Sequence, residues 1–126
     1  MPVLNRSSSG ADDAGGAFIQ LTADFLGVAP QKLRDRALIS GLVVAAASAV
    51  GLSPSGAPVV REMPDGVVAG LLMLDGCHIV AHGFPDRELV LLDLLGTAHH
   101  DVGKALDVFV RRLGAREVRS ETRARG

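Results

Sequence analysis

The stretch GVVAGLLMLDGCHIVAHGF, residues 66–84, contains two runs of strand-forming residues separated by a short polar segment. The first run, residues 66–75, is apolar at nearly every position, which predicts a central strand covered on both faces. Residues 57–63 precede this run, and the short connection at Pro64 and Asp65 predicts a hairpin between the two segments. We therefore expect an antiparallel sheet that includes this hairpin.

The second run, residues 77–84, contains the only cysteine of the chain and two of its four histidines. Side chains alternate between the two faces of a regular strand. One face would carry His78, Val80 and His82, and the other would carry Cys77, Ile79 and Ala81. The pattern therefore predicts that both histidines share a face that excludes Cys77.

The rest of the chain predicts three further strands and two helices. The strands are expected at residues 17–26, at 87–97, where the leucine content also fits a helix, and at 116–122, before a charged tail. The helices are expected at residues 30–50, which begin at a proline and become continuously apolar, and from residue 100 to Gly114. The fold class is α+β, a two-layer sandwich in which two helices cover one face of a mainly antiparallel sheet.

The domain organisation follows from length and local composition. A chain of 126 residues forms one domain and is short enough for oligomerisation to add stability. Residues 1–16 are rich in Ser, Gly, Ala and Asp, which predicts a flexible N-terminal leader. The single domain is expected to occupy residues 17–126.

Composition excludes several classes of partner and location. A formal net charge of −1, with no Trp and no Tyr, argues against binding to nucleic acid or to an anionic membrane. One cysteine excludes an intrachain disulfide and fits a reducing, cytoplasmic location, and the N-terminus has no apolar signal-peptide region. Residues 37–52 lack charge but are fewer than the roughly 20 residues needed to span a bilayer, so we expect a buried helix and no membrane.

Residue types alone leave three roles open for Cys77 and its neighbours. A lone cysteine beside an apolar strand is a common small buried hydrophobe. A metal site would need three or four convergent ligands, and the spacing of Cys77 and the histidines matches no closed zinc motif, so we expect no metal. A third role is nucleophilic catalysis, in which His82 acts as the base for Cys77.

The segment GCHIVAHGFPD, residues 76–86, resembles the autoprocessing segment of the prokaryotic S-adenosylmethionine decarboxylase proenzymes. That family carries Glu-Ser-His-(Ile/Leu)-x-x-His-Thr-(Trp/Tyr)-Pro-Glu at this place. The resemblance continues through LVLLDLLGT, residues 89–97, and through the helix that ends in Leu-Gly-Ala. Upstream, ADFLGVAPQKL and PDGVVAGLLMLDGCH are similar to the family's first strand with its helix entry and to the strand before the processing site. As a pattern of elements, the resemblance covers residues 17–126.

The resemblance implies a chain that cleaves itself to form a pyruvoyl group. In the family, the motif serine attacks the preceding carbonyl carbon, and elimination assisted by the second motif histidine leaves a pyruvoyl group at the new N-terminus. The pyruvoyl group then accepts electrons during decarboxylation, and a cysteine returns a proton to carbon. Family members form dimers whose sites draw on both subunits.

Carried over residue by residue, the resemblance assigns the processing bond to Gly76–Cys77. Cys77 takes the place of the serine, and His78 and His82 match the two motif histidines. Thr97 stands where the family has its proton-donating cysteine. His99 and His100, just beyond it, are alternative proton donors, although an exposed helix cap region is the favoured role for both. The substrate-binding candidates are Asp24 and Asp93, for the positive charge of a substrate, and Ala69, at the place of a serine that assists processing.

The sequence therefore implies two functions. The first is a divergent decarboxylase of S-adenosylmethionine or another amino acid, with polyamine-type metabolism as its setting and a pyruvoyl group derived from Cys77 as its cofactor. The second is a homologue that does not process its chain, and that binds a small ligand or pairs with an active paralogue. Both imply a homodimer or a heterodimer as the assembly.

Overall fold

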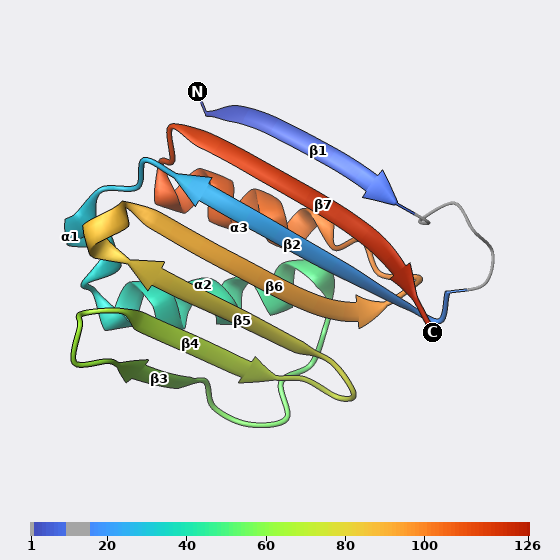
Figure 1. The fold of residues 1–126 in the computed structure, drawn as a ribbon. Helices are drawn as coiled ribbons and strands as arrows, with labels where there is room; N and C mark the ends of the chain where they lie inside the picture. Colours follow the sequence, from blue (N-terminus) through green and yellow to red (C-terminus); the bar gives the residue numbers. More distant parts are fainter. Residues whose placement is uncertain (1, 10–15) are drawn as a thin grey trace.

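The computed structural model describes residues 2–9 and 16–126, which form a sheet and a layer of helices (Figure 1). The strands of the described residues are β1 (Val3–Ser9), β2 (Phe18–Leu26), β3 (Val59–Glu62), β4 (Val68–Met73), β5 (His78–Phe84), β6 (Leu89–Thr97) and β7 (Glu117–Arg125). The helices are α1 (Pro30–Leu33), α2 (Arg36–Val50) and α3 (Gly103–Leu113), and a short 3-10 helix, η1 (Pro85–Arg87), joins β5 to β6.

The strands form one sheet in the order β1-β7-β2-β6-β5-β4-β3. Every neighbouring pair is antiparallel except β1 with β7, which is parallel. The predicted hairpin is confirmed as β3–β4, closed where the Met63 amide donates to the Val67 carbonyl at 2.7 Å. The strand alternative for residues 87–97 is also confirmed, since residues 89–97 form β6 between β2 and β5.

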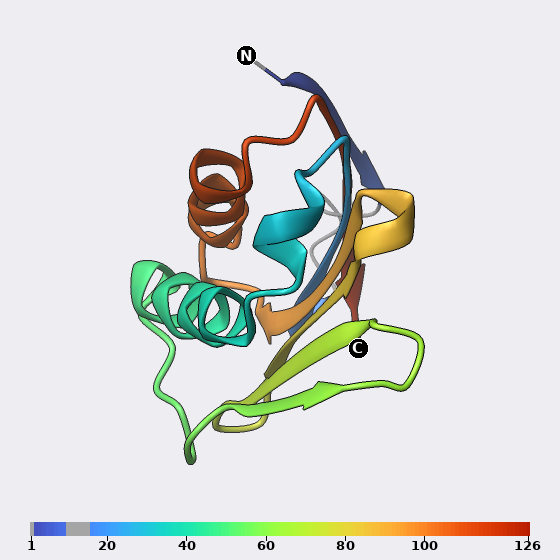
Figure 2. The same cartoon turned by 90° about the vertical axis from the view of Figure 1, so that its left-hand side faces the viewer.

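Helices α2 and α3 lie against the same face of the sheet, as Figure 2 shows. The α+β fold with two principal helices on one face is therefore confirmed. The amphipathic α3 buries its apolar face and ends at Gly114, which has a φ of 63°. The buried side chains of α3 are Ala105, Leu106, Val108, Phe109 and Leu113.

The single helix expected at residues 30–50 is wrong, because the structure divides it into α1 and α2. The break lies at Arg34 and Asp35, and the cause is local hydrogen bonding. The Asp35 carboxylate accepts hydrogen bonds from the amides of Ala37 at 3.0 Å and Leu38 at 3.2 Å, which makes Asp35 the N-cap of α2. Because an N-cap residue marks the start of a helix, α2 begins after Asp35. The continuous apolar composition of the residues that follow gives no sign of this break.

The run at residues 66–75 is covered on one face only, which corrects the expectation of a strand buried on both sides. Val68, Gly70 and Leu72 of β4 are buried toward the helices. The alternate residues lie on the opposite face, where Met73 is 53% exposed. The reason is that α1, α2 and α3 all lie on the same side of the sheet (Figure 2).

We call the sheet surface opposite α2 and α3 the open face. It has two halves of different chemistry. On β3 to β6 most of its side chains are apolar, namely Val59, Ala69, Leu71, Met73, Val80, Phe84, Leu89, Leu91 and Leu95. On β2 and β7 most are polar or charged, namely Gln20, Thr22, Asp24, Glu117, Arg119, Glu121, Arg123 and Arg125.

Residues 3–9, within the expected flexible leader, form strand β1, so the leader prediction is corrected for this part of the chain. β1 pairs along the outer edge of β7, with Val3 opposite Glu117 and Ser9 opposite Arg123 (Figure 1). Backbone hydrogen bonds to a free strand edge hold this segment, and they need no apolar periodicity in its sequence. Residues 10–15 of the expected leader lie outside the described residues. The expected charged tail also differs, because β7 continues to Arg125.

Among the described residues, no helix is long and apolar enough to cross a membrane.

Replacement of Gly70 by alanine tests the close packing between β4 and α2. A Cβ at Gly70 would lie 2.7 Å from Cγ2 of Ile39. The Ile39 side chain is β-branched and fully buried, so it has little room to move away. We expect Gly70→Ala to lower the free energy of unfolding by about 1–3 kcal/mol in urea denaturation. Gly41→Ala, within α2, is the control, because nothing lies within 4 Å of its new Cβ. That variant should be stabilised by up to about 1 kcal/mol, and equal stability of the two variants would contradict the packing argument.

Candidate functional site

The Gly76–Cys77 bond lies in the tight turn between β4 and β5. The Leu74 amide donates a hydrogen bond to the Cys77 carbonyl at 2.9 Å, with Asp75 and Gly76 at the tip of the turn. Gly76 has a φ of 74°, a conformation that favours glycine, and nothing lies within 4 Å of the position of a Cβ. Asp-Gly between two apolar runs is a strong hairpin signal. Asp75 and Gly76 are thus the sequence signal for the turn between β4 and β5.

The Cys77 side chain points from this turn into the hydrophobic core on the helix side of the sheet. It is only 3% exposed and belongs to the same buried cluster as Leu74 and Val102. Burial raises the pKa of the Cys77 thiol, and the negative charge of Asp75 adds to the increase. The raised pKa lowers the fraction of thiolate, which is the nucleophilic form of cysteine.

His82 lies on the open face, and the predicted alternation of β5 is confirmed. His82 lies five positions beyond Cys77 along an extended chain, which amounts to about 16 Å, and the two side chains project to opposite faces. The His82 ring packs against the ring of Phe84, with centroids 6.3 Å apart, and His82 is paired with Ala69 across β4 and β5. Within one chain, His82 and Cys77 are therefore not brought together.

Thr97, His99 and His100 form a cluster at the end of β6. The Thr97 hydroxyl is in contact with Nδ1 of His100 and lies 3.3 Å from Nδ1 of His99. The two imidazole rings lie side by side, with centroids 4.4 Å apart. Because His78 at the start of β5 is paired with Leu95, the end of β6 lies beside the turn that contains Cys77. The structure thus places Thr97 and the Gly76–Cys77 bond at the same end of the sheet.

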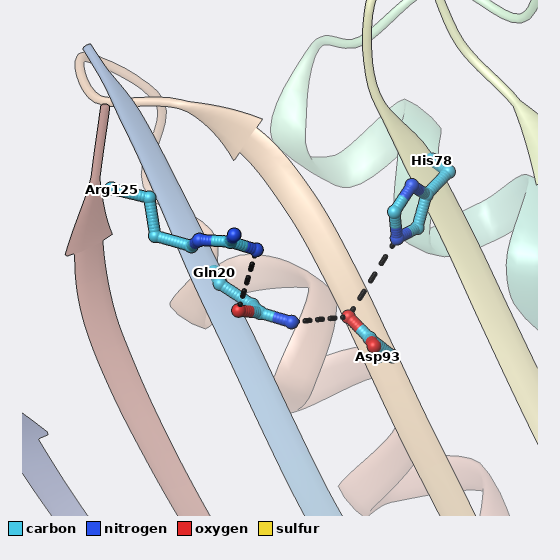
Figure 3. A network of polar contacts seen from close by, with 4 residues as sticks. All are labelled: Gln20, His78, Asp93 and Arg125. Carbon is cyan, nitrogen blue, oxygen red and sulfur yellow. Dashed lines mark hydrogen bonds and ion pairs between the residues drawn. The ribbon is translucent and has the colours of Figure 1, made fainter. Parts of the chain in front are cut away.

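A chain of polar contacts crosses four strands of the open face near this end (Figure 3). Arg125 of β7 donates from Nη1 to Oε1 of Gln20 at 3.2 Å, and Nε2 of Gln20 donates to Oδ1 of Asp93 at 3.1 Å. Nε2 of His78 lies 3.7 Å from the same Asp93 oxygen. The structure therefore gives Asp93 two neighbours, Gln20 and His78. Asp24, the other acidic candidate, lies further along β2 and takes no part in these contacts.

Within the part of the chain that the structure describes, no group of three or more His, Cys, Asp and Glu side chains is arranged to hold a metal ion. The Thr97 cluster supplies only two imidazoles, and Cys77 is buried away from them on the helix side.

Comparison with known proteins was made against family models, curated proteins and solved structures. The family model described as S-adenosylmethionine decarboxylase matches residues 19–126. The chain belongs to the S-adenosylmethionine decarboxylase family. The resemblance of residues 76–86 and their surroundings to this family is therefore confirmed at the level of the family. A search of the curated proteins found no match.

A solved structure gives the same result for the fold. The crystal structure of the adenosylmethionine decarboxylase from Aquifex aeolicus VF5 is similar to this chain with a TM-score of 0.78. The two sequences are 22% identical, and the match covers 90% of this chain and 93% of that one. At this identity the likeness establishes the fold, and family and fold together support a decarboxylase-like function.

The family depends in general on a pyruvoyl group made from its own chain, which here would derive from Cys77. The residues around Cys77 do not fit the formation of that group. The thiol is buried, which raises its pKa, and Thr97 stands where the family has its proton-donating cysteine. Ala69, which is paired with His82, has no side-chain hydrogen-bonding group.

Alkylation of the thiol tests the position of Cys77. Burial and the raised pKa both lower the amount of accessible thiolate, so iodoacetamide should react with native protein at least about tenfold more slowly than with protein unfolded in urea. The measurement is the mass increase with time at constant pH. Equal rates in the native and unfolded protein would mean that Cys77 is not held in the core.

Proposed function

We propose that this protein is a decarboxylase-like homologue whose chain stays intact at Gly76–Cys77. One observation carries this proposal: the Cys77 side chain is only 3% exposed in the core on the helix side of the sheet, and burial raises the pKa of its thiol. A thiol that attacks its own backbone needs a base, and the Cys77 side chain belongs to the apolar core cluster, with the like-signed charge of Asp75 nearby. The protein then acts by binding a small ligand or by pairing with an active paralogue.

The side chains at the other motif positions support the same proposal. Ala69 cannot donate or accept a hydrogen bond beside His82. The hydroxyl of Thr97 releases its proton far less readily near neutral pH than a thiol does. Asp93 remains the candidate for the positive charge of an amino acid or of S-adenosylmethionine, because it faces the open side of the sheet beside His78. The single free thiol supports a reducing, cytoplasmic setting.

A second candidate function is favoured by the geometry of the turn. Gly76 leaves the attacked carbonyl without side-chain obstruction, in a backbone conformation that other residues rarely adopt. If the turn opened, Cys77 Sγ would bond to the Gly76 carbonyl carbon as the peptide C–N bond breaks. Loss of the Cys77 Cα proton and breakage of the Cβ–Sγ bond would leave a Gly76 thiocarboxylate. Hydrolysis of the imine form of the other fragment would release ammonia and leave a pyruvoyl N-terminus.

The two functions differ in the intact mass of the purified protein. The non-processing homologue predicts a single species of 13.1 kDa under denaturing conditions, and it predicts no reaction with carbonyl reagents. Two fragments, residues 1–76 and 77–126, with the second one blocked to N-terminal sequencing, would overturn it in favour of self-cleavage. Cys77→Ala is the control, because it removes the nucleophile and must give an intact chain under either function. Cys77→Ser restores the hydroxyl of the family, and we expect it to stay intact as well, since Ala69 and the buried position of residue 77 are unchanged.

The apolar half of the open face supports assembly with a second copy of the chain or with a paralogue. Leu91 and Met73 are 37% and 53% exposed on this surface, which none of α1, α2 and α3 covers (Figure 2). A symmetric dimer would bury the same half on both subunits.

Light scattering tests the assembly. We expect the protein to be a dimer and Leu91→Glu to shift it toward the monomer, because a buried unpaired carboxylate is costly. Val44→Glu, at a residue of α2 that is 40% exposed, is the matched control and should leave the dimer unchanged. A monomeric wild-type protein would leave the paralogue as the partner, and an equal effect of both variants would place the interface elsewhere.

A further inference from the structure

The charged half of the open face contains a small hollow that the family resemblance does not involve. Its volume is about 100 Å³, and it is lined by Gln20, Thr22, Glu121 and Arg123. In the register of the sheet, Gln20 is paired with Arg123 and Thr22 is paired with Glu121. The four side chains therefore form the corners of a rectangle on β2 and β7.

Among residues 2–5 and 16–126, whose side chains the structure describes, the two charged corners have no ion-pair partner. The side-chain ion pairs of these residues are Arg34–Asp86, His78–Asp93 and Arg119–Glu117, and none includes Glu121 or Arg123. Residues two apart on a strand have Cα atoms separated by about 7 Å on the same face. Glu117 and Arg119 bridge the same spacing with an ion pair, whereas no ion pair joins Glu121 and Arg123, so both charges are available to a group that bridges them.

Gln20 forms a fixed wall of the hollow. Its Oε1 accepts from Arg125 and its Nε2 donates to Asp93, so both ends of the amide are oriented (Figure 3). An amide has two hydrogens on nitrogen and two lone pairs on oxygen, so one of each remains for a ligand. The neighbouring contacts thus set the orientation of a hydrogen-bonding group before any ligand arrives.

We propose that this hollow binds a small free α-amino acid as its zwitterion. The guanidinium of Arg123 pairs with the ligand's carboxylate, for which its planar donors are suited. The carboxylate of Glu121 accepts from the ligand's ammonium, and Gln20 and Thr22 complete the hydrogen bonds. The volume suits a ligand of the size of glycine or alanine. The site includes neither Gly76 nor Cys77, so it goes beyond the proposed function and holds whether or not the chain is cleaved.

Titration of the full-length protein with L-alanine, followed by amide NMR shifts, tests the site. We expect saturable shifts at residues 20–22 and 121–123, with a Kd on the order of 1 mM. Glycolate lacks the ammonium group and methylammonium lacks the carboxylate, so each should bind at least about tenfold more weakly. No saturation at ten times the expected Kd would overturn the proposal, and so would equal binding of glycolate, which would indicate an anion site only.

Matched variants separate the hollow from general surface charge. Arg123→Gln and Glu121→Gln should each weaken alanine binding by at least about tenfold. Arg119→Gln and Glu117→Gln are the controls, because these residues lie on the same strand and face and pair with each other at 2.7 Å. Each control variant changes the net charge by the same amount as its counterpart in the hollow and should leave alanine binding unchanged. An equal loss of binding in the control variants and in the hollow variants would overturn the proposal. The intact mass of each sample, measured separately, keeps this result distinct from the question of cleavage.

Discussion

The constraint on which the rest of the structure depends is that helices cover only one face of the sheet. Each strand must therefore place apolar side chains on the helix side, whatever it places on the other. This rule places two residues of the processing motif on different sides of the sheet: Cys77, just before β5, lies in the core, and His82 of β5 lies on the open face. The same rule leaves a surface of mixed chemistry, apolar on β3 to β6 and charged on β2 and β7. Processing depends on Cys77 on the helix side, whereas assembly and ligand binding depend on side chains of the open face.

Most of the fold could be predicted from apolar periodicity, because the main strands and α3 bury regular patterns. The failures have local physical causes. Asp35 interrupts the first helix through a side-chain cap, which a composition-based view of residues 30–50 does not detect. β1 is held by backbone hydrogen bonds to β7, so its Ser-rich sequence carries no periodic signal. A continuous apolar run such as residues 66–75 suits burial on two faces as well as on one, and only the positions of the helices decide between these arrangements.

The candidate site was predictable in part, for a similar reason. The resemblance led to Gly76, Cys77, His82 and Thr97, because these residues stand within or near one short motif. It did not lead to Gln20 and Arg125, which contact each other although 105 positions separate them in the sequence. Contacts across strands depend on register, and register is set by the complete sheet rather than by any segment. The side on which Cys77 lies did follow from alternation, whereas its pKa depends on the packed core around it.

The two edges of the sheet differ, and this difference has a consequence for aggregation. The outer strand on one side is β3, which has four residues and includes the charged pair Arg61 and Glu62, a composition that discourages strand addition by another molecule. On the other side β1 covers the longer β7. A chain shortened at its N-terminus would present the bare backbone edge of β7 to any extended peptide. The N-terminal strand β1 thus protects the edge of β7 from pairing with other chains. Its Ser-rich sequence suits this role, because β1 contributes backbone hydrogen bonds to the sheet rather than side chains to the core.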